Sequence, residues 1–291
     1  MYKTIRTLRI GLALICMGVP TVALIVGYSA IFSRMQSLVS LIAGSTACLV
    51  FWLAVSLVYG RLYCSTVCPL GTAMDGVSLL GRLVERRSRD YRYRQPSTKV
   101  RITFFTIAIV LILCGGAVLP TLLDPFTAYA RTVEALIARP VHLLGIGADI
   151  EAVCFSLTST ALGAAYALFV VVFAWRHGRR LCNTACPAGS LLGLASRRAI
   201  FHFDINTDKC INCGECERVC KSGCIDLCSH TIDTTRCVVC FDCTAICPND
   251  AITYRSGRHR LSMPMLQTTA GSRNAEADCS ADLQKKITEK E

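Results

Sequence analysis

The run Cys210-Ile-Asn-Cys213-Gly-Glu-Cys216-Glu-Arg-Val-Cys220 is followed along the chain by Cys237-Val-Val-Cys240-Phe-Asp-Cys243-Thr-Ala-Ile-Cys247-Pro248. Both runs have the spacing C-x2-C-x2-C-x3-C. Three cysteines spaced in this way wrap three corners of an iron–sulfur cubane, while the fourth cysteine of each run ligates the other cluster. The spacing therefore predicts two [4Fe–4S] clusters with crossed ligand sets: Cys210, Cys213, Cys216 and Cys247 for cluster 1, and Cys237, Cys240, Cys243 and Cys220 for cluster 2.

The alternative for these eight cysteines is a zinc module, but zinc sites use cysteine pairs separated by longer loops. Soft thiolates that a reducing cytoplasm keeps available select iron–sulfur clusters readily. The expected fold of residues 201–258 is therefore a small α+β bacterial ferredoxin-like domain. Lys221 stands where the first run would carry a proline, which loosens the turn after Cys220 but removes no ligand. In the connector, Cys224 is either an accessory thiol beside a cluster or, as we favour, uncommitted like Cys228.

The chain before this segment is unusually apolar. Of all 291 residues, 53% are hydrophobic, 18% are charged and nineteen are cysteines. Soluble enzymes carry roughly a quarter charged residues, and disulfide-stapled miniproteins are short chains, so both classes are excluded. Crossing a bilayer takes ~20 apolar residues, and four stretches without Asp, Glu, Lys or Arg are long enough: residues 10–32, 35–60, 102–123 and 152–175. We expect a four-helix transmembrane domain over residues 1–200, with the first span retained rather than cleaved as a signal peptide.

Basic residues gather on one side of these spans. The N-terminal tail, segment 61–101 and the segment after residue 175 are rich in arginine, whereas the other two connections hold few basic residues. Because cytoplasmic loops carry the excess of Lys and Arg, we expect a bacterial inner-membrane protein with both termini and the ferredoxin-like domain in the cytoplasm and segment 124–151 outside. This arrangement accounts for the net charge of +11 without a nucleic-acid partner.

An internal repeat follows the second and fourth spans. Its copies read Gly60-Arg61-Leu-Tyr-Cys64-Ser-Thr-Val-Cys68-Pro69 and Gly178-Arg179-Arg-Leu-Cys182-Asn-Thr-Ala-Cys186-Pro187. Copies in the same orientation are usually related by an axis along the membrane normal, so the two C-x3-C-P motifs should lie near each other at the cytoplasmic face. The candidate redox thiols are Cys64, Cys68, Cys182 and Cys186. They could bind a metal or cluster or form disulfides; alternatively, each Cys-Pro merely terminates a span and the thiols are idle. Nearby arginines and helix N-termini are expected to lower the pKa values of these thiols.

The sequence lacks the ligands and motifs of several other cofactors. All five histidines lie outside the spans, so a transmembrane b-type haem has no paired axial ligands, and no P-loop or dinucleotide fingerprint occurs. Cysteines within the spans are interpreted as small hydrophobes: Cys16, Cys48, Cys114 and Cys154. The outer segment either accepts quinol protons or, as we favour, is a solvated loop, with the polar residues Asp124, Glu134, His142, Asp149 and Glu151. Residues 259–291, including Cys279, are expected to form a disordered tail.

This order of features resembles the NapH/MauN family of membrane ferredoxin-type proteins, which share parts with the NosR-like regulators. The resemblance rests on the four spans, the two C-x3-C-P motifs and the eight ferredoxin cysteines, and it covers the chain from the first span to about Tyr254. The large periplasmic flavin-binding part of the NosR-like proteins has no counterpart in this sequence. The resemblance implies a four-helix membrane domain with cytoplasmic C-x3-C-P motifs and a cytoplasmic ferredoxin domain that holds two clusters.

Two functions are consistent with this resemblance. In the first, the chain is an electron carrier or the membrane component of a quinol dehydrogenase, and it passes electrons between the quinone pool and another iron–sulfur or cytochrome subunit. In the second, it is an accessory protein that serves the maturation or regulation of a periplasmic enzyme. Reduction potentials would separate them, because clusters that accept electrons from quinol favour the first function and very low potentials favour the second.

Overall fold

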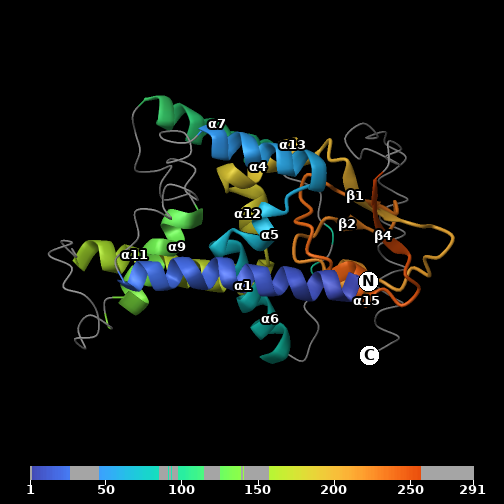
Figure 1. Ribbon diagram of the computed structural model, residues 1–291, viewed down its shortest axis with the longest axis horizontal. Helices are drawn as coiled ribbons and strands as arrows, with labels where there is room; N and C mark the ends of the chain where they lie inside the picture. The colour runs from blue at the N-terminus through green and yellow to red at the C-terminus, as the bar shows by residue number, and fades with distance from the viewer. Residues whose placement is uncertain are drawn as a thin grey trace.

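The computed structural model describes residues 2–26, 46–84, 91, 93, 98–114, 125–138, 140 and 157–256 (Figure 1). Within these ranges the chain is helical up to residue 196 and combines strands with short helices after it. Several residues considered in the sequence lie outside the described ranges: Asp124, His142, Asp149, Glu151, Cys154, Cys279 and the segment 257–291.

Four apolar helices overlap the four stretches predicted as spans. They are α1 (Tyr2–Val26), α4 (Thr46–Tyr59), α7 (Thr98–Leu113) and α11 (Leu157–His177). Each exposes large apolar side chains, among them Leu8, Phe51, Ile102 and Leu168. One helix among the described residues, Tyr2–Ile25 within α1, is by itself long and apolar enough to cross a membrane, and the apolar helices Ala47–Tyr59 and Gly163–His177 are shorter. The described residues therefore do not establish four crossings.

Each C-x3-C-P motif folds as a one-turn helix followed by a second helix. The pairs are α5 (Tyr63–Thr66) with α6 (Pro69–Val84), and α12 (Arg180–Thr184) with α13 (Pro187–Ser196). Proline is the first residue of α6 and α13, a position where no backbone N–H is needed. A glycine with positive φ opens each copy, +78° at Gly60 and +58° at Gly178. At Gly178 a Cβ would also lie 2.7 Å from the carbonyl oxygen of Lys221, so only glycine fits this position.

The segment after residue 200 alternates strands and short helices. The order is β1 (Phe201–Ile205), α14 (Glu215–Val219), β2 (Ile225–Asp226), β3 (Thr231–Ile232), α15 (Asp242–Ile246) and β4 (Ile252–Ser256). β1 pairs antiparallel with β4, from Phe201 opposite Ser256 to Ile205 opposite Ile252, and β2 pairs antiparallel with β3. Phe203, Phe241 and Ile225 are among the buried residues of its core, which also includes several of the cysteines. This is the α+β composition expected for a ferredoxin-like domain.

Figure 1 shows the strands and α15 at one end of the molecule, beside the N-terminus of α1. Towards the other end lie α11, α9 (Pro125–Val133) and the π-helix η1 (Glu134–Ala138) that continues α9. Both α9 and η1 contact α1 and α11, and Phe126, Tyr129 and Val133 are buried. For residues 125–138 the interpretation as a solvated loop is therefore wrong, because the apolar face of α9 packs into the helical bundle.

Candidate iron–sulfur and thiol sites

The two cysteine runs fold into loops of the same shape. Each contains two residues with left-handed backbone, Asn212 and Gly214 in the first and Val239 and Phe241 in the second, with φ between 52° and 80°. α14 and α15 start directly after these loops, carry the third cysteine of each run, and end at the fourth in extended conformation. A left-handed φ is unfavourable for a β-branched residue such as valine, so the surrounding structure imposes this tight curl.

Cys247 of the second run borders the same pocket as the first three cysteines of the first run. A pocket is lined by apolar side chains, including Ile205 and Ile252, and by the four thiols of Cys210, Cys213, Cys216 and Cys247. Burial, and after it the thiols of Cys213, Cys210 and Cys247, raise the pKa of Cys216 to about 12. Thiols crowded in this way ionise only when a bound cation compensates them.

Cys220 is correspondingly close to the second run. Burial, and after it the thiols of Cys240, Cys237 and Cys220, raise the pKa of Cys243. Burial is also the main reason why the pKa of Cys240 is raised to about 12. The chain thus brings together the two groups of four cysteines that the crossed pattern predicts.

Cys224 is an accessory thiol of the second group. Its Sγ lies 3.4 Å from Sγ of Cys220, and it also hydrogen-bonds Cys237. Our preference for an uncommitted connector cysteine is therefore wrong for Cys224, because β2 begins at the next residue and holds this position against the cluster-2 cysteines.

The donor chemistry of both groups fits iron–sulfur clusters. Within the described ranges, no three His, Cys, Asp or Glu side chains converge on a point where one metal ion could bind. A cubane, in contrast, takes one ligand at each of several separate corners. The donors in both groups are sulfur atoms, a soft ligand set that suits iron–sulfur clusters.

Two arginines cross between the copies of the repeat. Arg61 donates to Oδ1 of Asn183 at 2.6 Å and to the carbonyl oxygen of Cys182 at 3.4 Å. Arg179 donates in the opposite direction, to the carbonyl oxygens of Cys64 at 2.5 Å and Gly71 at 3.0 Å. Both arginines are 0% exposed. The two C-x3-C-P motifs therefore lie side by side, as the symmetry of the repeat predicts.

Three of the four motif cysteines, Cys64, Cys68 and Cys182, belong to one apolar core, which also contains Met74, Leu192 and Val238. Sγ of Cys68 accepts the backbone N–H of Gly71 at 3.4 Å, and Sγ of Cys186 accepts that of Gly189 at 3.3 Å. Burial nevertheless raises the pKa values of Cys68, Cys182 and Cys186. The expected lowering is therefore wrong for these thiols, because the loss of water outweighs the arginines and the backbone donors.

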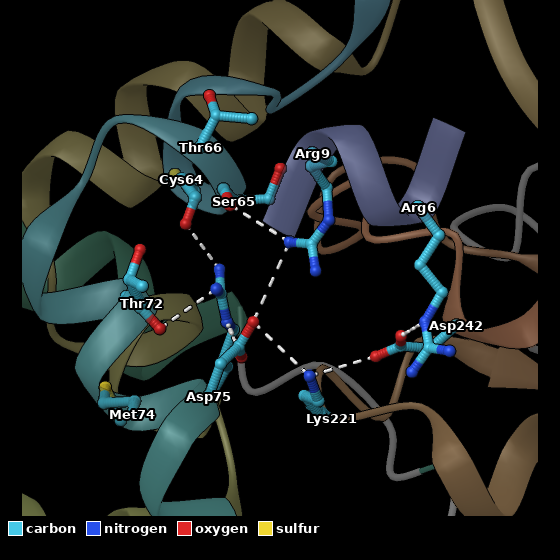
Figure 2. A network of polar contacts seen from close by, with 12 residues as sticks. Arg6, Arg9, Cys64, Ser65, Thr66, Thr72, Met74, Asp75, Lys221 and Asp242 are labelled. Carbon is cyan, nitrogen blue, oxygen red and sulfur yellow. Dashed lines mark hydrogen bonds and ion pairs between the residues drawn. The ribbon is translucent and has the colours of Figure 1, made fainter. Parts of the chain in front are cut away.

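A chain of charges, buried except for Arg6 at its end, connects the repeat to the ferredoxin-like segment (Figure 2). Asp75 of α6 pairs with Arg179 at 2.7 Å and with Lys221 at 3.4 Å. Lys221 in turn pairs with Asp242 at 3.0 Å, and Asp242 with Arg6 of α1 at 2.7 Å. Burial alone would raise the pKa of Asp75, but the charges of Arg179 and Lys221 lower it to about 2.

The structure gives a reason for lysine at a position where the ferredoxin pattern has proline. Lys221 bridges carboxylates of α6 and α15, and its backbone oxygen accepts the N–H of Arg179 at 3.0 Å. From the sequence, no ion pair was predicted for Asp75 or Lys221, and no contact between the two copies of the repeat was predicted for Arg61 or Arg179. The recurrence of Gly-Arg in both copies was a usable signal for the two arginines, whereas no local pattern links Asp75 to Lys221.

Comparison with known proteins supports the iron–sulfur chemistry. A family model described as a 4Fe-4S binding domain matches residues 42–87 and 160–206, and a second model with the same description matches residues 203–226. The 4Fe–4S ferredoxin-type domain predicted from the cysteine spacing is thus present. The first model covers both C-x3-C-P motifs.

Several curated proteins are similar to this chain. YccM of Escherichia coli K12 is 27% identical over 62% of this chain and 46% of its own length. The methylamine utilization ferredoxin-type protein MauN of Paracoccus denitrificans is 26% identical over 56% of this chain and 49% of its own. The ferredoxin-type protein NapH of E. coli K12 is 30% identical over 55% and 47%. The chain spans about half the length of these relatives, and no solved structure matches it.

Proposed function

We propose that this chain, a homologue of the NapH, MauN and YccM ferredoxin-type proteins, is a membrane-bound iron–sulfur protein that transfers electrons. Its homologues confirm the family resemblance noted from the motifs. We infer that electrons pass between the quinone pool and a redox protein, another iron–sulfur or cytochrome subunit, through two [4Fe–4S] clusters in the ferredoxin-like segment.

The ligands we assign are the two crossed sets. Cys210, Cys213, Cys216 and Cys247 hold cluster 1, and Cys237, Cys240, Cys243 and Cys220 hold cluster 2, in keeping with the two groups of neighbouring thiols. Bound clusters supply one-electron redox chemistry. The chain itself buries the sulfur ligands and places cationic side chains beside them: Lys221 and Arg179 interact electrostatically with Cys240. Positive charge near a cluster favours its reduced state, because the added electron is attracted.

The observation that carries this proposal is the position of Cys240. It packs against the core formed by the two C-x3-C-P motifs, next to the buried Val238. Cluster 2 would therefore lie at the interface with the helical bundle. Cluster 1 would face outward, since its pocket is bordered by Ile211, which is 62% exposed. Electrons entering from the membrane side would reach cluster 2 first and leave for a partner from cluster 1.

Four membrane crossings are the arrangement that we infer for the helical part. The exposed apolar side chains of α1, α4, α7 and α11 support it, because a helix that is hydrophobic all round needs a cover of protein or lipid. The arginine-rich segments support a cytoplasmic ferredoxin-like domain. This would place cluster 2 and both C-x3-C-P motifs at the inner face of a bacterial cytoplasmic membrane.

A reporter active only in the cytoplasm should be active when fused after Arg255. The same reporter inserted into segment 139–156 should be silent, while one active only outside the cytoplasm should work there. Loop insertions of matched length after residue 90 would serve as the cytoplasmic control. Activity of the cytoplasmic reporter in segment 139–156 would contradict the four-span arrangement.

Electron entry from quinol can be tested on the full-length protein purified anaerobically in detergent. An excess of a reduced quinol analogue should produce the EPR signals of reduced [4Fe–4S] clusters, while the oxidised quinone should not. Dithionite gives the signal of full reduction as a reference. If dithionite reduces both clusters but the quinol analogue reduces neither, electron transfer from the quinone pool is refuted, and the accessory role in maturing or regulating another enzyme is favoured.

A further inference from the structure

Arg61 is a fully buried cation that pairs with no carboxylate of the described residues. Its exposure is 0%, and its acceptors are the side chain of Asn183, the backbone oxygens of Cys182 and Thr235, and Sγ of Cys64 at 3.6 Å. Its Nε has no hydrogen-bond partner in the part of the chain that the structure describes. Within the described residues no carboxylate forms an ion pair with it, whereas Arg179 at the equivalent position of the other copy pairs with Asp75 at 2.7 Å.

A buried charge without a counterion is strongly destabilising, so this position calls for a negative group nearby. A second cation, Arg101 at the start of α7, increases the need for negative charge near Arg61. Arg101 donates to the backbone oxygen of Ser190 at 3.1 Å. Burial, and after it the charge of Arg61, lower the pKa of Arg101 to about 10. The Asp233 carboxylate attracts Arg101 but forms its ion pair with Arg236 at 2.7 Å. Among the described residues, the groups that can become negative beside Arg61 are the thiols of Cys64, Cys182 and Cys186.

We propose that Cys64, Cys68, Cys182 and Cys186 together hold a third iron–sulfur cluster of the [4Fe–4S] class, with two ligands from each copy of the repeat. On binding, each thiol releases its proton to solvent, and the four thiolates give the cluster a net negative charge. That charge neutralises Arg61. A disulfide between any two of the thiols is uncharged and would leave Arg61 without a counterion.

Local geometry supports this assignment. The four thiols are unpaired and, apart from the partly buried Cys186, buried. Cys68 and Cys186 each accept a backbone N–H at the start of a long helix, α6 or α13, and such donors stabilise a ligating thiolate. A family model described as a 4Fe-4S binding domain covers both motifs. Since Cys240 packs against the same core, a third cluster would be a direct neighbour of cluster 2.

The inference deepens the proposed function, but its test does not depend on quinol as the electron donor. The full-length protein, purified anaerobically, should contain about twelve iron atoms and twelve acid-labile sulfides. The double variant Cys68→Ser/Cys186→Ser should contain about eight of each and keep the EPR signals of the ferredoxin clusters. Cys114→Ser, which removes an exposed thiol outside all three ligand sets, is the matched control and should retain about twelve.

Arg61 is a positioning residue in this scheme, and Arg61→Gln gives a second readout. Removing its charge should lower the midpoint potential of one cluster and leave the other two unchanged, because the reduced, more negative state loses its nearest cation. If the unmodified protein contains only about eight iron atoms, the third cluster is absent and the proposal is refuted. Unchanged iron content in the Cys68→Ser/Cys186→Ser protein would do the same, and either result would leave electron transfer by the ferredoxin clusters intact.

Discussion

Exchange of Cys247 for serine should remove cluster 1 and leave cluster 2 in place, although Cys247 follows the cluster-2 cysteines in the sequence. Its thiol borders the same pocket as those of Cys210, Cys213 and Cys216. A cubane with three cysteine ligands loses iron or disassembles, so we expect a loss of one to four iron atoms per chain, on the order of a whole cluster. Iron and sulfide content and the EPR spectrum of the dithionite-reduced protein measure this directly.

The matched variant Cys220→Ser should show the opposite pattern. Cys220 follows the cluster-1 cysteines, but it is one of the neighbours that raise the pKa of Cys243, so cluster 2 should be lost and cluster 1 kept. Cys224→Ser controls for the mere loss of a buried thiol beside Cys220, and both clusters should survive it. Loss of cluster 2 in Cys247→Ser, with cluster 1 preserved, would refute the crossed ligand assignment.

Replacing Asp75 by asparagine should destabilise the protein by about 3–5 kcal/mol, because it leaves the buried Arg179 without its carboxylate partner and Lys221 with only one of its two. Asp75 pairs with Arg179, which is 0% exposed, and with Lys221. The side chains of α6 and of the ferredoxin-like segment meet at this carboxylate (Figure 2). Unfolding by SDS in mixed micelles gives the free energy of unfolding of the variant and the unmodified protein under the same conditions.

Glu215→Gln provides the comparison for an ion pair at the surface. Arg218 and Glu215 are 2.6 Å apart, but both are about one-third exposed, so losing this pair should change the free energy of unfolding by less than about 1 kcal/mol. Equal effects of the two substitutions would contradict the buried docking role of Asp75.

The pH dependence of the Asp75 contribution follows from its lowered pKa. The folded pKa of about 2 lies below the ordinary value of 3.8, so the stabilisation is fully present above the ordinary value and is lost as the pH falls towards 2. The difference in stability between the unmodified protein and Asp75→Asn should therefore stay constant from about pH 8 to about pH 5 and shrink below about pH 4.

Local spacing was sufficient to predict that the chain contains a 4Fe–4S ferredoxin-type domain. The C-x2-C-x2-C-x3-C pattern reflects how three neighbouring residues can surround a cubane, and this geometry depends only on the backbone between them. The same holds for the repeat: matching Gly-Arg and C-x3-C-P segments led to the prediction that the motifs lie together, and the crossing contacts of Arg61 and Arg179 agree with it. The long apolar stretches predicted where the helices form, because the backbone hydrogen bonds of an α-helix join residues only four positions apart in one continuous segment.

Partnerships between distant residues were decided by the tertiary structure alone. Asp75 and Lys221 come from parts of the chain with no common pattern, and they meet only because α6 packs beside the ferredoxin-like segment. The pKa values of Cys68, Cys182 and Cys186 were predicted in the wrong direction, because arginines and helix starts are visible in a sequence while the burial that outweighs them is not. Cys224 and the buried helix α9 were misjudged for the same reason. Solvent exclusion depends on all the segments that surround a group, so it is fixed only once the whole chain has folded.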